Sequence, residues 1–285
     1  MCGLAGFCDF TGVDSNSEQI CHAMASKLMH RGPDDAGIWV NPEHGIALGH
    51  RRLSIQDLTS CGHQQMESTS GRYVIAYNGE IYNFRQLQTE LSKIGFEFRG
   101  HSDTEVLLAA MEAWGLADAL TRFTGMFAFA LWDEKQRVLS LARDRIGEKP
   151  LYYGWHGDSL LFGSELKALR AHPHWQNNIN RNALALYMRH NYIPAPYSIY
   201  QNIHKLTPGT LLQIPHSTKA GVLPAPVPYW NMKAVAESGV RNPVDLSDEE
   251  AIDKLDSLLR ESIRNQMISD VPLGAFLSGG YDSSA

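Results

Sequence analysis

The chain opens with Met1-Cys2-Gly3-Leu4-Ala5-Gly6-Phe7-Cys8-Asp9-Phe10, and this stretch decides the fold that we expect. Small and apolar residues alternate along it before Thr11-Gly12, which predicts a β-strand at the start of the chain. Removal of Met1 would leave Cys2 with a thiol beside a free α-amino group. The amine can serve as a base for the thiol near neutral pH, because their ordinary pKa values are about 7.7–8.0 and about 8.5. Cys2 is therefore a candidate nucleophile, and the competing interpretation is a small buried strand residue.

Length, composition and charge exclude several classes of protein. With 285 residues, 44% of them hydrophobic, the chain has the size of roughly two domains and the composition of a globular protein. Its net charge of −6 is spread along the chain, which argues against a nucleic-acid-binding surface. No apolar run reaches the ~18 residues of a membrane helix and no signal peptide is recognisable, so we expect a cytoplasmic protein. The spacing of its 4 cysteines and 12 histidines predicts reduced thiols and no metal site.

Short apolar runs bounded by turn residues predict many strands before residue 214. The predicted strands, besides the first, are 37–40, 45–49, 73–77, 126–132, 138–142, 151–155 and 159–162. The predicted helices are 18–29, 84–94 and 103–114. Helices and strands do not alternate one for one, so the pattern favours an α+β fold with antiparallel sheets covered by helices.

The composition changes after about residue 214. Four prolines between Pro215 and Pro228 predict a linker or wrapping segment over 215–246. Ser247 and Glu250 have the spacing of a capping box, and a helix with one apolar face should follow. Val271–Leu277 is predicted as a buried strand. Residues 247–285 would thus be the first helix and strand of an incomplete α/β domain.

Two further groups of residues could carry chemistry. Asn78 and Gly79 directly follow an apolar strand, where a side-chain amide and a backbone N–H could stabilise an oxyanion; an Asn-Gly hairpin turn is the alternative. Arg52 could bind the carboxylate of an α-amino acid while Asp103 binds its ammonium group. The alternatives are a solvated surface arginine and, for Asp103, a helix N-cap.

A third candidate is the loop Ser278-Gly279-Gly280-Tyr281-Asp282-Ser283, which follows the predicted strand Val271–Leu277. Its backbone N–H groups could bind an anion such as pyrophosphate at the start of a helix. The alternative is an ordinary turn.

Several motifs occur in a fixed order along the chain. They are Met1-Cys2-Gly3, His30-Arg31-Gly32-Pro33-Asp34, Arg52-Leu53-Ser54-Ile55, Tyr77-Asn78-Gly79-Glu80, Ser102-Asp103-Thr104-Glu105, Ala142-Arg143-Asp144-Arg145, Lys149-Pro150-Leu151-Tyr152, Ser164-Glu165 and Ser278-Gly279-Gly280 with Asp282-Ser283. This ordered set resembles the glutamine-dependent asparagine synthetases over the whole chain. The resemblance implies a class II glutamine amidotransferase domain over 2–214, a four-layer αββα sandwich of the N-terminal-nucleophile hydrolase type. An ATP pyrophosphatase-type synthetase domain would begin at 247–285.

The resemblance also implies roles for individual residues. Cys2 would be the nucleophile, Asn78 and Gly79 the oxyanion hole, and Arg52 and Asp103 the substrate clamp. The implied lining of the glutamine pocket is Leu53, Ser54, Ile55, Gln56 and Glu80, together with Asn78 and Gly79. The implied ATP loop is Leu277, Ser278, Gly279, Gly280, Asp282 and Ser283.

The implied reaction is hydrolysis of L-glutamine to glutamate and ammonia through a thioester on Cys2, with no cofactor. In full-length relatives the ammonia amidates aspartate with ATP and Mg²⁺. Tyr281 stands where many relatives have leucine, so a sugar or uronic acid acceptor stays open, as does a non-catalytic fragment. No nucleic-acid or membrane partner is expected, and a homodimer is one candidate assembly.

Overall fold

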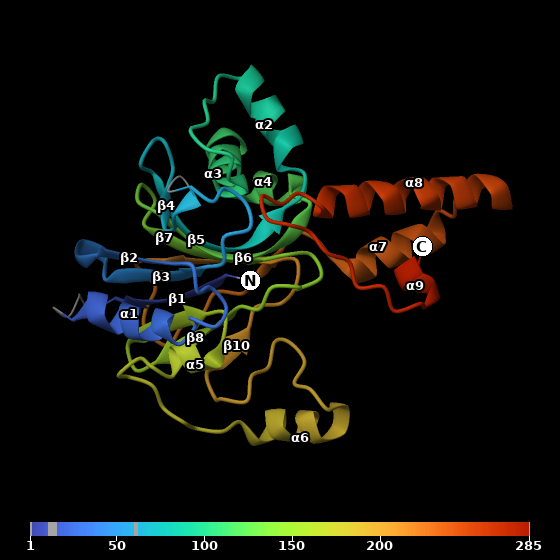
Figure 1. Ribbon diagram of the computed structural model, residues 1–285. Coiled ribbons are helices and arrows are strands. Elements are labelled where there is room, and N and C mark those ends of the chain that lie inside the picture. Colours follow the sequence, from blue (N-terminus) through green and yellow to red (C-terminus); the bar gives the residue numbers. More distant parts are fainter. Residues whose placement is uncertain (1, 11–15, 60–61, 285) are drawn as a thin grey trace.

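The computed structural model describes residues 2–10, 16–59 and 62–284, and Figure 1 shows its elements. The strands are β1 (Gly3–Asp9), β2 (Asp35–Asn41), β3 (Ile46–Arg52), β4 (Met66–Glu67), β5 (Tyr73–Ile81), β6 (Gly125–Asp133), β7 (Val138–Arg143), β8 (Tyr152–His156), β9 (Ser159–Gly163), β10 (Ile203–Lys205), β11 (Thr210–Pro215) and β12 (Val227–Pro228). The helices are α1 (Ser17–Ser26), α2 (Phe84–Lys93), α3 (Asp103–Trp114), α4 (Leu116–Arg122), α5 (Leu166–Leu169), α6 (Arg181–His190), α7 (Met232–Arg241), α8 (Asp248–Gln266) and α9 (Tyr281–Ser284), with a 3₁₀ turn at Pro42–His44. Every helix and strand predicted before residue 214 is present; α3 has the predicted ends, and the other elements have shifted ends.

Two antiparallel sheets form the centre of the molecule. One has the strand order β10-β8-β9-β1-β3-β2 and the other β12-β11-β7-β6-β5-β4. Their facing sides share one apolar core, to which β1 contributes Leu4 and β6 contributes Trp132. Two more cores lie on the outer faces, one under α2, α3 and α4 and the other under α1 and α5. The order of layers is therefore helix, sheet, sheet, helix (Figure 1), as predicted.

The alternation of side chains along β6 shows how the sequence specifies these layers. Phe127, Phe129 and Leu131 belong to the core beneath the helices. Ala128 and Ala130 belong to the core between the sheets, where small side chains let the sheets approach. Both faces of this strand are buried, because it lies inside the second sheet with a layer on each side.

The structure corrects the prediction for Asn78 and Gly79. Both lie inside β5, opposite Ala128 and Phe127 of β6, and they form neither a strand end nor a hairpin turn. The two strands approach so closely here that a Cβ on Gly79 would lie 2.4 Å from the Met126 carbonyl oxygen. Glycine therefore keeps β5 paired through this position, and long-range pairing overrides the local turn preference.

The predictions beyond residue 214 need several corrections. Helix α8 begins with the predicted capping box of Ser247 and Glu250. Residues 215–246 hold two elements that were not predicted, namely β12, which pairs with β11, and α7. Val271–Leu277 is not a strand, and that prediction was wrong. A strand needs a neighbour for its backbone N–H and C=O groups, and no described segment pairs with this one.

The described part of the chain bears on the predictions for membrane helices, metal sites and cysteines. No helix there is long and apolar enough to cross a membrane, and no cluster of three His, Cys, Asp or Glu side chains could hold a metal ion. Cys8 and Cys21 are buried free thiols, whereas Cys2 is partly exposed. Met1, Thr11-Gly12 and Cys61 lie outside the described residues.

Candidate active site

Cys2 lies immediately before β1, at one end of the first sheet. The pairing of β1 with β3 sets Gly3 opposite Arg51 and so brings Cys2 beside Leu53, the residue after β3. The Sγ atom lies 3.4 Å from the Leu53 nitrogen, which donates to it, and 3.6 Å from the Leu53 carbonyl oxygen. Burial raises the pKa of the Cys2 thiol, and the hydrogen bond from Leu53 opposes this only in part. The thiol is therefore protonated at neutral pH and needs a base to become a nucleophile.

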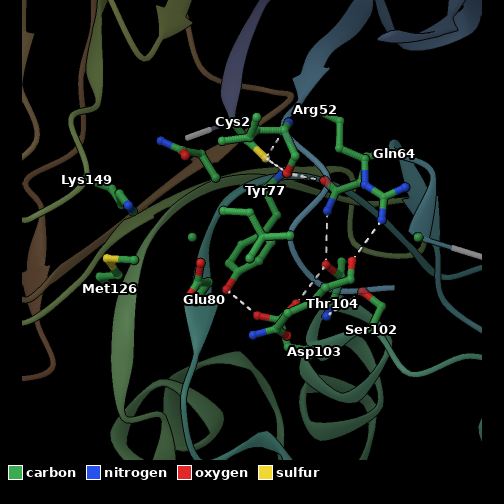
Figure 2. A pocket seen from close by; sticks show the side chains of 16 residues that line it. Cys2, Arg52, Gln64, Tyr77, Glu80, Ser102, Asp103, Thr104, Met126 and Lys149 are labelled. Atoms are coloured by element: carbon green, nitrogen blue, oxygen red, sulfur yellow. Dashed lines mark hydrogen bonds between the residues drawn. The ribbon is translucent and has the colours of Figure 1, made fainter. Parts of the chain in front are cut away.

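The thiol opens onto a pocket between the two sheets and the start of α3 (Figure 2). The pocket is lined by Cys2, Arg52, Leu53, Ile55, Gln56, Gly62, Gln64, Tyr77, Asn78, Gly79, Glu80, Ser102, Asp103, Thr104, Met126 and Lys149. The structure thus brings together the residues predicted for the glutamine site, with one exception. Ser54 does not belong to this lining, and its backbone N–H donates to Asp34 Oδ2 at 2.8 Å.

Arg52, the last residue of β3, is nearly buried. Its guanidinium donates to the carbonyl oxygens of Gln56, Asp57 and Thr59, so the loop after β3 curls around it. No carboxylate of the described residues lies within 4.0 Å of the Arg52 guanidinium. Its positive charge is not neutralised by direct contact, which suits it to bind a carboxylate from a ligand. Because the Arg52 side chain is buried, the surface-arginine alternative is excluded.

Asp103 is the first residue of α3, and Ser102 is the N-cap, because its hydroxyl accepts from the Thr104 backbone N–H at 3.2 Å. The N-cap alternative for Asp103 was therefore wrong. Its Oδ2 atom accepts from the Tyr77 hydroxyl at 2.9 Å and from the Ile81 backbone N–H at 2.8 Å. Burial raises the pKa of the Asp103 carboxyl, while these hydrogen bonds counteract the effect.

Asn78 is the most unusual side chain of the pocket. It is 1% exposed, and neither its Oδ1 nor its Nδ2 atom has a hydrogen-bond partner among the described residues. A buried amide is normally paired, so an amide without partners beside a pocket points to a ligand that supplies them.

The backbone N–H of Gly79 points to the same side of β5 as the N–H groups of Tyr77 and Ile81. The N–H of Tyr77 donates to Gln64 Oε1, and the N–H of Ile81 donates to Asp103, so both point away from β6. Because N–H groups alternate in direction along a strand, that of Gly79 points the same way, toward the pocket that this residue lines. Asn78 and Gly79 can therefore present two donors to one atom in the pocket.

A network behind Cys2 explains motifs to which the sequence assigned no role. Arg31 Nε donates to the Cys2 carbonyl oxygen at 2.9 Å, and its Nη1 atom pairs with Glu165 at 3.0 Å. Glu165 also contacts His30 and Lys167, each at 3.1 Å. Residues far apart in the sequence thus hold the backbone of Cys2. The fixed order of their motifs was the signal that pointed to them.

Glu80, Met126 and Lys149 form another wall of the pocket (Figure 2). Burial raises the pKa of the Glu80 carboxyl and lowers the pKa of the Lys149 amine. Lys149 belongs to one of the ordered motifs but was not predicted as a site residue, and the same holds for Tyr77, Ser102 and Thr104. Gln64, Gly62 and Met126 carried no sequence signal.

The loop that was predicted to bind ATP has a different character. Leu277 is 75% exposed and Tyr281 is 97% exposed, and α9 is a single turn. The side chains of Asp282 and Ser283 lie outside the described ones. Gly279, Gly280, Tyr281 and Ser284 line a wide-open hollow. Because the described residues around it are exposed, they do not by themselves fit ATP, and no catalytic step is assigned to them.

Comparison with known proteins agrees with this geometry. Residues 1–230 match the glutamine amidotransferase domain family. This chain belongs to the glutamine amidotransferase family. Residues 254–285 of the amidotransferase match a second family, asparagine synthase.

The relatives of this amidotransferase are longer proteins. It is 37% identical to asparagine synthetase (glutamine-hydrolyzing) 3 and 35% identical to asparagine synthetase (glutamine-hydrolyzing) 1, both of Bacillus subtilis strain 168. Each match covers 100% of this chain, but only 44% and 43% of the two relatives, so the chain spans less than half of their length.

A solved structure shows the same fold at low sequence identity. Glutamine phosphoribosylpyrophosphate amidotransferase from B. subtilis matches with a TM-score of 0.58 and 20% identity, over 81% of this chain and 49% of the other. The likeness confirms the predicted α+β sandwich.

Proposed function

We propose that this chain hydrolyses L-glutamine to L-glutamate and ammonia through a γ-glutamyl thioester on Cys2. The observation that carries the proposal is the buried, unpaired amide of Asn78 in the pocket that also holds Cys2, Arg52 and Asp103. Arg52 would bind the α-carboxylate of glutamine and Asp103 its α-ammonium group. This places the side-chain amide of the substrate toward Cys2 and Asn78.

The reaction then needs one base and one oxyanion site. After loss of Met1, the α-amine of Cys2 takes the thiol proton, and Sγ attacks the amide carbon of the substrate. Asn78 Nδ2 and the Gly79 N–H stabilise the oxyanion, and the protonated amine gives its proton to the departing ammonia. Water, deprotonated by the same amine, attacks the thioester, so glutamate leaves and the thiol is restored.

For a longer protein we propose that the ammonia amidates aspartate in an ATP-dependent step with Mg²⁺. The support is the match of residues 254–285 to asparagine synthase and the names of the relatives. These relatives do not favour a sugar or uronic acid acceptor or a non-catalytic fragment. A cytoplasmic location and a homodimer remain predictions.

The test is glutamate release from L-glutamine by the purified chain, with intact mass to detect loss of Met1. Cys2→Ala should abolish turnover, while Cys21→Ala, which alters a buried thiol on α1, should retain it. Retained turnover in Cys2→Ala would refute the thioester mechanism. Absence of turnover in a folded chain that has lost Met1 would refute the proposal for this chain by itself.

A further inference from the structure

Tyr77 lines the pocket, yet the proposed chemistry does not use it. The residue lies on β5 directly before Asn78, and its side chain is buried. Its hydroxyl donates a 2.9 Å hydrogen bond to Asp103 Oδ2, and Figure 2 shows the ring pointing toward Asp103. The hydroxyl thus joins the strand that carries the oxyanion donors to the helix that carries the clamp carboxylate.

The backbone of Tyr77 is held on both sides. Its N–H donates to Gln64 Oε1 at 2.8 Å, and the Nε2 atom of Gln64 donates to Thr104 Oγ1 at 3.0 Å. Its carbonyl oxygen accepts from His50 Nε2 at 2.7 Å. Since these contacts fix the origin of the side chain, the hydroxyl reaches Asp103 from one defined direction.

The two oxygen atoms of Asp103 differ in their surroundings. Oδ2 accepts from both the Tyr77 hydroxyl and the Ile81 N–H, at 2.9 and 2.8 Å. Oδ1 lies 3.5 Å from Thr104 Oγ1, a long contact, and the Thr104 backbone N–H also interacts with the Asp103 carboxyl group. Oδ1 is therefore the atom with more room for a further donor, and an ammonium group is such a donor.

We propose that Tyr77 is a positioning residue for recognition of the substrate α-ammonium group. Its hydroxyl donates to Asp103 Oδ2 and so directs Oδ1 toward the substrate. The inference rests on the proposed function, in which Asp103 binds that ammonium group. Burial and the neighbouring Asp103 charge raise the pKa of Tyr77 well above its usual value. The phenol therefore stays protonated and remains a donor.

The experiment compares two ligands that differ only in the α-amino group. Cys2→Ala chains bind without turnover, and ligand-observed NMR gives dissociation constants for L-glutamine and for glutaramate, which lacks that group. Adding Tyr77→Phe should reduce the preference for glutamine roughly threefold to tenfold. Equal weakening of both ligands would mean a general structural role and would overturn the inference, as would an unchanged preference.

Further variants separate this inference from the function on which it rests. Asp103→Asn should lose the preference for glutamine. If this variant keeps the preference, Asp103 does not bind the α-ammonium group and the proposed clamp is wrong. Failure of both ligands to bind the Cys2→Ala chain would also refute the clamp. If only Tyr77→Phe keeps the preference, only the role of Tyr77 is wrong. 4-Aminophenylalanine at position 77 retains a donor and should keep the preference. If Tyr77→Phe does not fold, 4-fluorophenylalanine at this position fills the space without donating and should reduce it.

Discussion

Asn78 shows at the scale of a single residue how a site can be recognised by what it lacks. Both polar atoms of its buried amide are without a partner among the described residues. Such a group lowers the free energy of unfolding by about 1–3 kcal/mol relative to a paired one. The Nδ2 donor beside the Cys2 thiol is understandable if its missing partner is an oxygen that carries charge only during the reaction.

We expect Asn78→Ala to lower kcat for glutamine by roughly 10²–10³-fold with little change in KM, because one oxyanion donor is lost. Stability should fall by no more than about 1 kcal/mol, since the lost packing is offset by removal of an unpaired amide. Steady-state kinetics and urea denaturation measure both, with Asn182→Ala at an exposed position as the control. A loss confined to KM would contradict the oxyanion role.

At the scale of elements, one buried carboxylate organises the loop between β7 and β8. Asp144 accepts backbone hydrogen bonds from Phe127 on β6 and from Gly147, Glu148 and Lys149, at 2.6–3.2 Å. These bonds place Lys149 in the wall of the pocket. The motif around Asp144 was visible in the sequence, but its partners were not, because Phe127 is on another strand.

Asp144→Ala should lower the free energy of unfolding by about 3 kcal/mol or more, because several buried N–H donors lose their acceptor together. The matched control is Asp158→Ala, at an exposed position of the turn between β8 and β9. Urea denaturation of both variants decides the matter. Equal stability of the two would show that backbone pairing alone holds the loop.

At the scale of the whole molecule, the segment after α8 touches the pocket loop. Asp270 Oδ2 accepts from the Asp57 N–H at 2.7 Å, and the Asp270 N–H donates to the Ile55 carbonyl oxygen at 2.9 Å. The Asp57 carbonyl oxygen in turn accepts from Arg52. Residues matched to asparagine synthase thus support the loop that holds the clamp arginine.

Asp270→Ala should raise KM for glutamine about twofold to tenfold and leave kcat unchanged, because the loop around Arg52 loses a hydrogen-bond acceptor. Asp256→Ala on α8, which pairs with Arg260 and is remote from that loop, is the control. Steady-state kinetics of the two variants give the answer. Identical KM values would show that the Asp270 side chain does not influence the site.

Two buried histidines predict how the stability of the whole molecule depends on pH. Burial lowers the pKa of His50 and of His172 to about 4 each. Between pH 6.5 and 4 the unfolded chain therefore binds more protons, so stability that is fully present above pH 6.5 is lost as the pH falls. We expect a loss of about 2 kcal/mol per histidine between pH 7 and 5.

Urea denaturation at pH 7 and pH 5 measures this loss. His172→Gln should reduce the pH dependence, with His22→Gln at an exposed position of α1 as the control. If the free energy of unfolding depends on pH equally in the unchanged chain and in His172→Gln, the lowered pKa of His172 does not contribute.

The sequence by itself determined features that depend on neighbours along the chain. The strand at the start, helix α3 at Asp103–Trp114 and the capping box of α8 follow from periodicity and capping chemistry. The order of its motifs also indicated which residues belong together. Only the tertiary structure decided that Asn78-Gly79 continues a strand, that Val271–Leu277 forms none, and that Tyr77 contacts Asp103. Each of these depends on a partner distant in sequence, because strand pairing and the burial of polar groups are set by contacts that local preferences do not specify.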